Sequence, residues 1–282
     1  MMKVTVLIEN TAPEGSGLAY EAGLSLYIEY NRKKILLDAG VSGDFAANAE
    51  KLGVDLKEVE LGVLSHGHFD HADGLRSFFP INDRVQILLR PGAEGPYFSL
   101  GREVPYFIGI HREVWNDYRD RFRFVDGIHS LGEGMWLLPD GEVDPEFTGR
   151  AKDLVYKRGE DDFLPDDFRH EQSLVFETER GLAVFNSCSH SGIVNIVRGV
   201  QKMLPGKKVY AVVGGFHMFG KGTANGMNCS EEYVYKVADA LKQLGVEEVY
   251  TGHCTGLPAL ALLKERFGEG CRGLTTGMRF EL

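Results

Sequence analysis

The amino-acid sequence predicts an α/β fold in which short buried strands alternate with amphipathic helices. Apolar stretches of strand length recur along the chain, and several of them are followed by segments whose apolar residues repeat with helical spacing. The chain contains 35 glycines, and most of them fall where a predicted strand ends, which suits an enzyme built on loops better than a helical bundle. The second half of the chain also repeats the order of elements in the first half.

The first half is predicted to open with a β-meander, whose second and third strands meet at a turn at Asn31-Arg32. A helix follows, because apolar residues keep a helical period there, with Ser42 or Asp44 as its N-cap. A second, short helix is expected at 73–79. The strands predicted in this half span residues 4–9, 24–30, 34–38, 61–65 and 85–89.

Residues 91–167 are predicted to be an insertion, because prolines and glycines recur there and the regular spacing weakens. Within it, 122–125 and 135–138 have the composition of strands, whereas the acidic segment 160–167 is expected to be a solvated loop. Aromatic side chains and arginines are dense in this insertion, and both would suit an anionic aromatic ligand. We therefore expect the insertion to form a wall of the substrate pocket. The arginines are Arg112, Arg119, Arg121 and Arg123.

The second half is predicted to begin with a hairpin that turns at 179–181. A helix with an apolar face starts at Ile193, and a second helix starts at Ser230, whose hydroxyl is suited to an N-cap. The strands predicted here span residues 173–178, 182–186, 209–213 and 248–251.

Composition limits the classes of function. A formal net charge of −10 disfavours binding to nucleic acid, because neutralising phosphates requires a basic surface. No apolar run approaches the length of a membrane span, and the apolar run near the start is too short for a signal peptide. The four cysteines show no paired spacing, so we expect a reducing, cytoplasmic location. The length and composition allow one large domain or two small ones, and we expect a single domain over residues 1–282.

The most informative stretch is residues 65–71, Ser-His-Gly-His-Phe-Asp-His, which we call the metal loop. A single histidine in a loop is usually solvated or hydrogen-bonded. The metal loop instead places three imidazoles and one carboxylate within six residues, and these are the donors that a divalent cation such as Zn²⁺ prefers. The potential ligands are His66, His68, Asp70 and His71.

Three further histidines each follow a predicted strand of the second half: His190, His217 and His253. Ligands collect at strand ends in α/β proteins because the loops there can aim several side chains at one point. One such histidine would most often be structural. Together with the four candidates in the metal loop, they make six or seven donors, which match two metal ions better than one.

The metal loop matches the pattern His-x-His-x-Asp-His, and on this motif the chain resembles the metallo-β-lactamase-fold hydrolases. Segments elsewhere resemble one subgroup, the superfamily II metal-dependent hydrolases, which includes proteins similar to dihydropterin ribofuranosylaminobenzene phosphate synthase. The resemblance implies an αββα sandwich of two mixed β-sheets flanked by helices. The segments that carry it are residues 9–10, 21–25, 171–174, 187–192, 214–217 and 252–256.

The resemblance also implies a ligand set. One divalent ion would be held by His66, His68 and His190, and a second by Asp70, His71 and His253, with a bridging water or hydroxide. Zinc is the favoured metal, with iron or manganese as alternatives.

Other residues receive supporting roles. Many members of the family place a bridging carboxylate near the position of Cys188, which is therefore either a ligand or a thiol that supports the ligands; we favour support. Glu171 and Glu9 are expected to support the ligands through hydrogen bonds. His217 is expected to transfer a proton or to face the substrate. His170 could be a ligand because it adjoins Glu171, but it follows the acidic loop and a structural role is favoured. No functional role is assigned to His111 and His129.

The function expected from the resemblance is hydrolysis, in which a metal-bound hydroxide attacks an ester or phosphoester-type small molecule and Asp70 orients the nucleophile. One alternative is a synthase-like transferase that joins a pterin diphosphate to an aromatic ribosyl phosphate. Another is a metal-binding sensor or effector without turnover. We expect a small-molecule substrate and neither nucleic acid nor membrane as partner, and the sequence leaves a homo-oligomer open.

Overall fold

The computed structural model describes residues 2–148, 153–160, 162–220 and 223–282. The chain divides into two compact units, each with its own sheet and core. Unit 1 comprises Met1–Asp126, Lys152–His170 and Thr275–Leu282, and unit 2 comprises Gly127–Ala151 and Glu171–Leu274. The predicted insertion is therefore divided between the units. The expectation of one domain stays a prediction.

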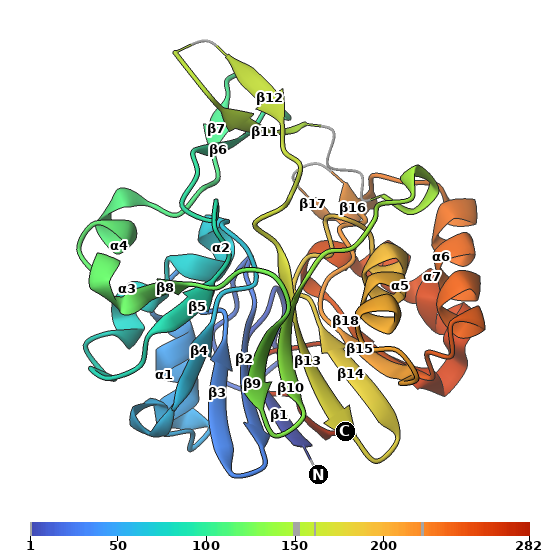
Figure 1. The fold of residues 1–282 in the computed structure, drawn as a ribbon, viewed down its shortest axis with the longest axis horizontal. Helices are drawn as coiled ribbons and strands as arrows, with labels where there is room; N and C mark the ends of the chain where they lie inside the picture. Colours follow the sequence, from blue (N-terminus) through green and yellow to red (C-terminus); the bar gives the residue numbers. More distant parts are fainter. Residues whose placement is uncertain (1, 149–152, 161, 221–222) are drawn as a thin grey trace. The chain divides into compact units, whose positions relative to one another are not determined.

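Unit 1 contains a seven-stranded mixed sheet in the order β20-β1-β2-β3-β4-β5-β8 (Figure 1). The pairings from β20 to β3 are antiparallel, and those from β3 to β8 are parallel. The carboxyl ends of β3, β4, β5 and β8 therefore meet at one edge. The strands are β1 (Met2–Ile8), β2 (Ser25–Tyr30), β3 (Lys33–Leu37), β4 (Leu61–Val63), β5 (Ile87–Leu89), β8 (Phe122–Phe124) and β20 (Arg279–Glu281).

Short helices cover one face of this sheet, because their apolar side chains and those of the strands form one buried core. Phe45 of α1 and Phe78 of α3 are fully buried in it, together with Leu36 and Leu89 from the strands. The helical elements are α1 (Asp44–Lys51), η1 (Leu56–Glu58), α2 (Phe69–Ala72), α3 (Leu75–Phe78), α4 (Arg112–Trp115) and η2 (Arg119–Arg121).

Unit 1 also holds a small four-stranded antiparallel sheet in the order β12-β11-β6-β7. All of its strands come from the predicted insertion. They are β6 (Tyr97–Ser99), β7 (Tyr106–Phe107), β11 (Leu154–Lys157) and β12 (Phe163–Pro165).

Unit 2 contains a second seven-stranded mixed sheet in the order β19-β18-β15-β14-β13-β10-β9 (Figure 1). Its pairings are parallel from β19 to β14 and antiparallel from β14 to β9, which reproduces the division seen in unit 1. The strands are β9 (His129–Gly132), β10 (Met135–Pro139), β13 (Gln172–Thr178), β14 (Gly181–Phe185), β15 (Val209–Val213), β18 (Glu248–Thr251) and β19 (Cys271–Gly273), with β16 (Phe219–Gly220) and β17 (Thr223–Met227) as a separate ribbon.

Three long helices pack on the sheet of unit 2 through a second apolar core (Figure 1). The core joins α5 residues such as Val197 and α6 residues such as Val237 to Val212 and Val249 of the strands. Burial of this apolar surface is the main stabilising term. The helical elements are η3 (Pro145–Phe147), α5 (Ile193–Met203), α6 (Glu231–Gln243), η4 (His253–Thr255), α7 (Leu257–Phe267) and η5 (Gly268–Gly270).

The structure confirms the α/β class and the two mixed sheets with their helices. It also confirms the hairpin at 179–181 and the cap of α6, where the Ser230 hydroxyl accepts from the Tyr233 N–H. In the part of the chain that the structure describes, no helix is both long and apolar enough to cross a membrane.

Two local predictions were wrong, and one helix is shorter than predicted. The N-cap of α1 is Gly43, because the Ser42 hydroxyl accepts from the Asp44 N–H and Asp44 is already helical. The helix expected at 73–79 is present as α3, which is shorter at both ends; Asp73 and Gly74 separate it from α2. The acidic segment 160–167 is not a loop throughout where it is described, because Phe163–Pro165 pair with β11 as β12, although Leu164 and Asp167 are exposed; Asp161 lies outside the described residues.

Candidate metal centre

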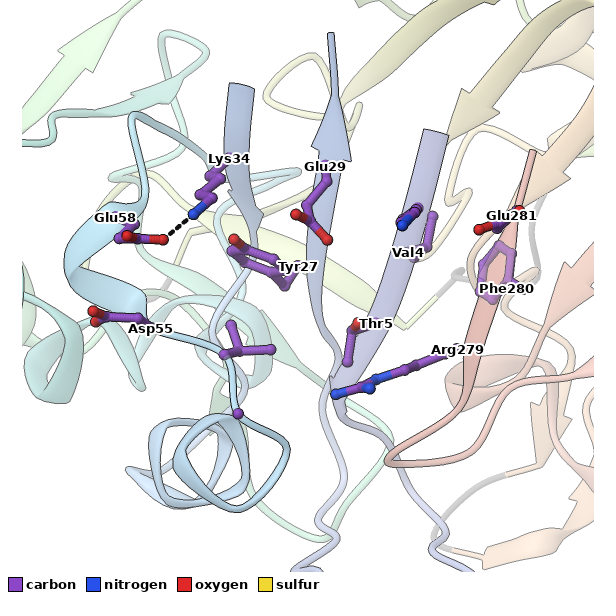
Figure 2. A pocket seen from close by; sticks show the side chains of 13 residues that line it. Val4, Thr5, Tyr27, Glu29, Lys34, Asp55, Glu58, Arg279, Phe280 and Glu281 are labelled. Carbon is purple, nitrogen blue, oxygen red and sulfur yellow. Dashed lines mark hydrogen bonds and ion pairs between the residues drawn. The ribbon is translucent and has the colours of Figure 1, made fainter. Parts of the chain in front are cut away.

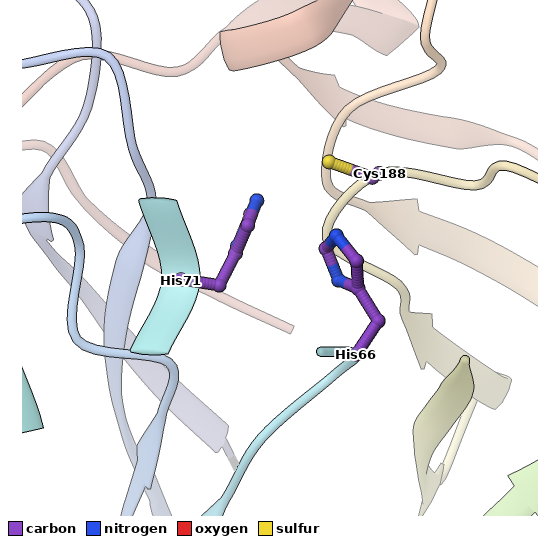
Figure 3. A group of neighbouring side chains, drawn as sticks. All are labelled: His66, His71 and Cys188. Carbon is purple, nitrogen blue, oxygen red and sulfur yellow. The ribbon is translucent and has the colours of Figure 1, made fainter. Parts of the chain in front are cut away.

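The metal loop leaves β4 and enters α2 at the carboxyl edge of the sheet of unit 1. Within it, the His66 Nε2 and His68 Nδ1 atoms lie 3.0 Å apart, and the His66 and His71 rings have centroids 4.4 Å apart (Figure 3). Two imidazole nitrogens on one tetrahedral zinc ion lie about 3.3 Å apart. The loop therefore brings its three imidazoles close together, and the spacing of His66 and His68 suits a shared ion.

Asp38, at the end of β3, organises two of these imidazoles. Its Oδ1 accepts from the Ser65 N–H, and its Oδ2 accepts from the Ser65 hydroxyl and from His71 Nδ1, at 2.7, 2.7 and 2.8 Å. Because the Ser65 hydroxyl hydrogen points to Asp38, its oxygen accepts from His66 Nδ1 at 2.8 Å. With these partners His66 and His71 carry their protons on Nδ1, so Nε2 is the nitrogen of each ring that would bind a metal.

Burial, with a further contribution from His170, lowers the pKa of His68 to about 3. His68 is therefore neutral at pH 7, which is the state that binds metal. The preceding Gly67 is required by close packing, since a Cβ there would lie 2.0 Å from the Ala93 carbonyl oxygen. No side chain fits at that distance, so the loop conformation depends on glycine.

His170 holds the same loop from the other side, a role that the sequence did not indicate. Its Nδ1 accepts from the Gly67 N–H at 3.0 Å, and its Nε2 donates to Asp166 at 3.1 Å. Both side chains are buried, and the Tyr97 ring lies against His170 with centroids 4.2 Å apart. Tyr97 and Asp166 belong to the insertion, so the insertion reaches the metal loop.

Asp70 and Glu9 occupy different surroundings. The Asp70 carboxylate is 23% exposed and lies 3.6 Å from His71 Nε2, the nitrogen of that ring that would bind a metal. The Glu9 carboxylate is buried and accepts from the N–H and the hydroxyl of Thr11.

In unit 2, His190, His217 and His253 follow the parallel strands β14, β15 and β18, as predicted. The His190 and His217 rings have centroids 4.4 Å apart. His217, His253 and Ser189 all adopt left-handed backbone, with φ of 49°, 46° and 53°. Such strain in residues other than glycine is concentrated at functional sites, because packing elsewhere must hold it in place.

Glu171 supports His190 through the backbone. Its two carboxylate oxygens accept from the N–H groups of His190 and Ser191 at 3.0 and 3.2 Å. Burial is the main cause that raises the pKa of Glu171 well above its usual value, and the neighbouring Asp140 raises it further. The carboxylate therefore holds the backbone of the loop that carries His190, and the supporting role expected for Glu171 stays a prediction.

Cys188 lies in the same loop as His190, and its Sγ is 3.5 Å from the Sγ of Cys254 (Cys188 is drawn in Figure 3). Both thiols are buried. Burial raises the pKa of Cys254, but Cys188, His253 and His217 outweigh burial and hold that pKa well below its usual value. The sequence did not single out Cys254, because its partner lies 66 residues away.

The other histidines and the cavity of unit 1 lie outside this arrangement. His111 binds the Asp73 carboxylate, and His129 belongs to β9. Unit 1 has a cavity of about 570 Å³ next to the Lys34–Glu58 ion pair, lined in part by Tyr27 (Figure 2). None of the candidate ligands lines this cavity.

Together, two mixed sheets and a His- and Asp-rich loop at a carboxyl edge define a class of metal-binding α/β proteins. Residues 20–93 match the sequence profile described as "Metallo-beta-lactamase superfamily". The chain is 31% identical to the 7,8-dihydropterin-6-methyl-4-(beta-D-ribofuranosyl)-aminobenzene-5'-phosphate synthase of Methanocaldococcus jannaschii, over 98% of this chain and 95% of that protein. The chain belongs to the metallo-β-lactamase superfamily. The synthase of M. jannaschii that it matches represents the subgroup that the sequence resembles.

Solved structures agree with this assignment. The structure of Tm1679, described as a metal-dependent hydrolase of the β-lactamase superfamily, has a TM-score of 0.81 and 30% identity, with 100% of this chain and 99% of that chain covered. A diphosphatase of the PhnP family has a TM-score of 0.54 at 15% identity, covering 100% of this chain and 98% of that chain. The second similarity is one of fold alone.

Proposed function

We propose that this protein is a metal-dependent hydrolase that cleaves an ester or phosphoester bond of a small molecule. The observation that supports the proposal most is the hydrogen bonding of the metal loop. Asp38 orients His71 directly and His66 through Ser65, and His68 is neutral at pH 7. Divalent ions lower the pKa of the water that they bind, which supplies a nucleophile at neutral pH. The donor set fits such ions because it consists mainly of buried imidazole nitrogens in the neutral form that binds metal.

Under this proposal His66, His68 and His190 hold one ion, and Asp70, His71 and His253 hold a second. Zinc suits these nitrogen and carboxylate donors best, and iron and manganese are the alternatives. The family membership and the His and Asp grouping of the metal loop support the assignment.

Side chains would also orient the attacking water, transfer a proton and support the loops. Asp70, whose carboxylate is 23% exposed, would orient the attacking water. His217 is half-buried beside His190, so it would pass a proton to or from the substrate rather than bind metal. Glu171 and Glu9 would keep the loops in place.

The substrate is proposed to be an anionic aromatic small molecule. Tyr97 lies 6.0 Å from His68 between ring centroids, and Tyr106 lies 6.2 Å from Phe69, so aromatic rings of the insertion border the metal loop. Arg121 does not serve such a substrate, because it donates to backbone carbonyls, one of them at Val85. Cytoplasmic location stays a prediction.

Metal analysis tests the proposal directly. Protein purified without chelator and reconstituted with zinc should hold between about one and two equivalents, because the donors exceed the needs of one tetrahedral ion. It should hydrolyse at least one member of a panel of phosphodiesters, phosphomonoesters, lactones and thioesters. His68→Ala and His253→Ala should lose metal and activity together. Metal contents below about a tenth of an equivalent would contradict the proposal.

A second candidate function is group transfer, which the 31% identity to a synthase favours. Turnover in ¹⁸O-labelled water separates the two: label in the product indicates hydrolysis. An acceptor-dependent reaction without label, for example with an aminobenzoyl ribosyl phosphate, indicates transfer. Stable metal binding without turnover of any substrate would favour a sensor.

A further inference from the structure

We propose that Cys188 and Cys254 supply thiolate ligands to the ion that His253 holds, so that unit 2 carries a sulfur-rich metal site. The inference deepens the proposed function, since it rests on His253 as a ligand. It goes beyond the supporting role that the sequence favours for Cys188, and it adds Cys254.

The spacing of the sulfur atoms fits a shared ion. Two thiolates bound at about 2.3 Å to a zinc ion lie about 3.3 to 3.8 Å apart, for S–Zn–S angles between about 90° and 109° as found in five- and four-coordinate sites. The Cys188 and Cys254 Sγ atoms are 3.5 Å apart, which falls within that range. One ligand atom of Cys188, one of Cys254 and one of His253 all lie within 4.8 Å of one another.

The backbone of neighbouring residues leaves room for the Cys254 sulfur or contacts it. Gly215 gives its sulfur room, since a Cβ on Gly215 would lie 2.4 Å from it. The His217 N–H donates to the same sulfur at 3.3 Å, an interaction that stabilises a thiolate. His253 adopts left-handed backbone at φ 46°, immediately before Cys254. A thiol that only filled space would need neither this donor nor this strain.

Cys271 shows what an ordinary buried cysteine of unit 2 looks like. It lies on β19 within the apolar core, and burial raises its pKa to about 11. Such a neutral thiol packs as a small apolar side chain. Cys271 is therefore the matched control for the pair.

Thiolate ligands would have two chemical consequences. They favour zinc, cobalt and cadmium over manganese, because sulfur is a soft donor. They would also make metal affinity depend on pH, since the ligand is the deprotonated sulfur.

The test is optical and uses cobalt as the probe. Wild-type protein loaded with Co²⁺ should show thiolate-to-cobalt charge-transfer absorption in the near ultraviolet. Cys188→Ser and Cys254→Ser should each lower this absorption by about half and weaken Co²⁺ binding by at least about tenfold. Cys271→Ser should retain the full absorption.

The outcomes separate the two proposals. If the wild type binds Co²⁺ without charge-transfer absorption, the thiolate site is refuted while the hydrolase proposal stands. If the wild type binds no Co²⁺ and no Zn²⁺, both fail. The wild-type spectrum decides the matter even if a serine variant does not fold.

Discussion

Replacing Asp38 with asparagine should weaken metal binding through the protonation of His71. Asp38 accepts three hydrogen bonds, and an asparagine side chain at this position can keep only the one from the Ser65 N–H at Oδ1. Its Nδ2 would face the Ser65 hydroxyl and His71 Nδ1 as a donor. His71 would then accept at Nδ1 and carry its proton on Nε2, the nitrogen that a metal needs.

The expected magnitudes follow from these contacts. Two hydrogen bonds to a carboxylate are lost, each worth about 1.5–3 kcal/mol, and rotation of the Ser65 hydroxyl recovers part of this. The free energy of unfolding of the metal-free protein should therefore fall by about 2–4 kcal/mol. Changing the partner of a metal-binding histidine typically costs about 10- to 100-fold in affinity, or about 1.4–2.8 kcal/mol.

Two measurements test this expectation: urea unfolding of the metal-free protein, and competition for Zn²⁺ with a chromogenic chelator at pH 7. Asp73→Asn is the matched control, because Asp73 is also a buried carboxylate that binds a histidine, His111, which is not a candidate ligand. The control should lose stability but keep zinc affinity within about threefold. If Asp38→Asn matches the control in affinity, the role assigned to Asp38 is wrong.

Three further predictions concern the loop and its neighbours. Gly67→Ala should lose several-fold in metal affinity and destabilise the protein, because its Cβ meets the Ala93 carbonyl; melting curves and metal content measure this. His170→Asn should retain more metal affinity than His170→Gln, because only asparagine places an acceptor where Nδ1 receives the Gly67 N–H; equal losses would contradict the assigned contact. His217→Ala should keep its metal and lower turnover, whereas His68→Ala loses both; an emptied site in His217→Ala would make His217 a ligand.

The sequence predicted the metal loop because its signal is local. Three histidines and one aspartate within six residues need no knowledge of the fold to be noticed. Most strands were predicted for the same reason, since an apolar run such as 209–213 carries its own pattern. The cap of α6 at Ser230 is likewise a local signal.

The residues that hold the metal loop through hydrogen bonds lie far from it in sequence, so the sequence did not predict them. Asp38 is one acid at the end of one strand, and only the pairing of β3 with β4 brings it to Ser65, 27 residues away. His170 reaches Gly67 across 103 residues, and its partner Asp166 belongs to an acidic segment whose composition predicts solvation, although the Asp166 side chain is buried. Contacts of this kind depend on tertiary pairing, which composition and periodicity do not encode.

The chain order of the two units has a consequence for how the protein is made. Strand β20 pairs with β1, yet the larger segment of unit 2, Glu171–Leu274, lies between β12 and β20 in the chain. A ribosome therefore completes unit 2 before it supplies the strand that covers the edge of β1. Closing so long a loop costs only slightly more free energy than closing a short one, but it slows folding. Until then β1 presents an open edge, and a nascent chain paused at that point is where we would look for chaperone binding or misassembly.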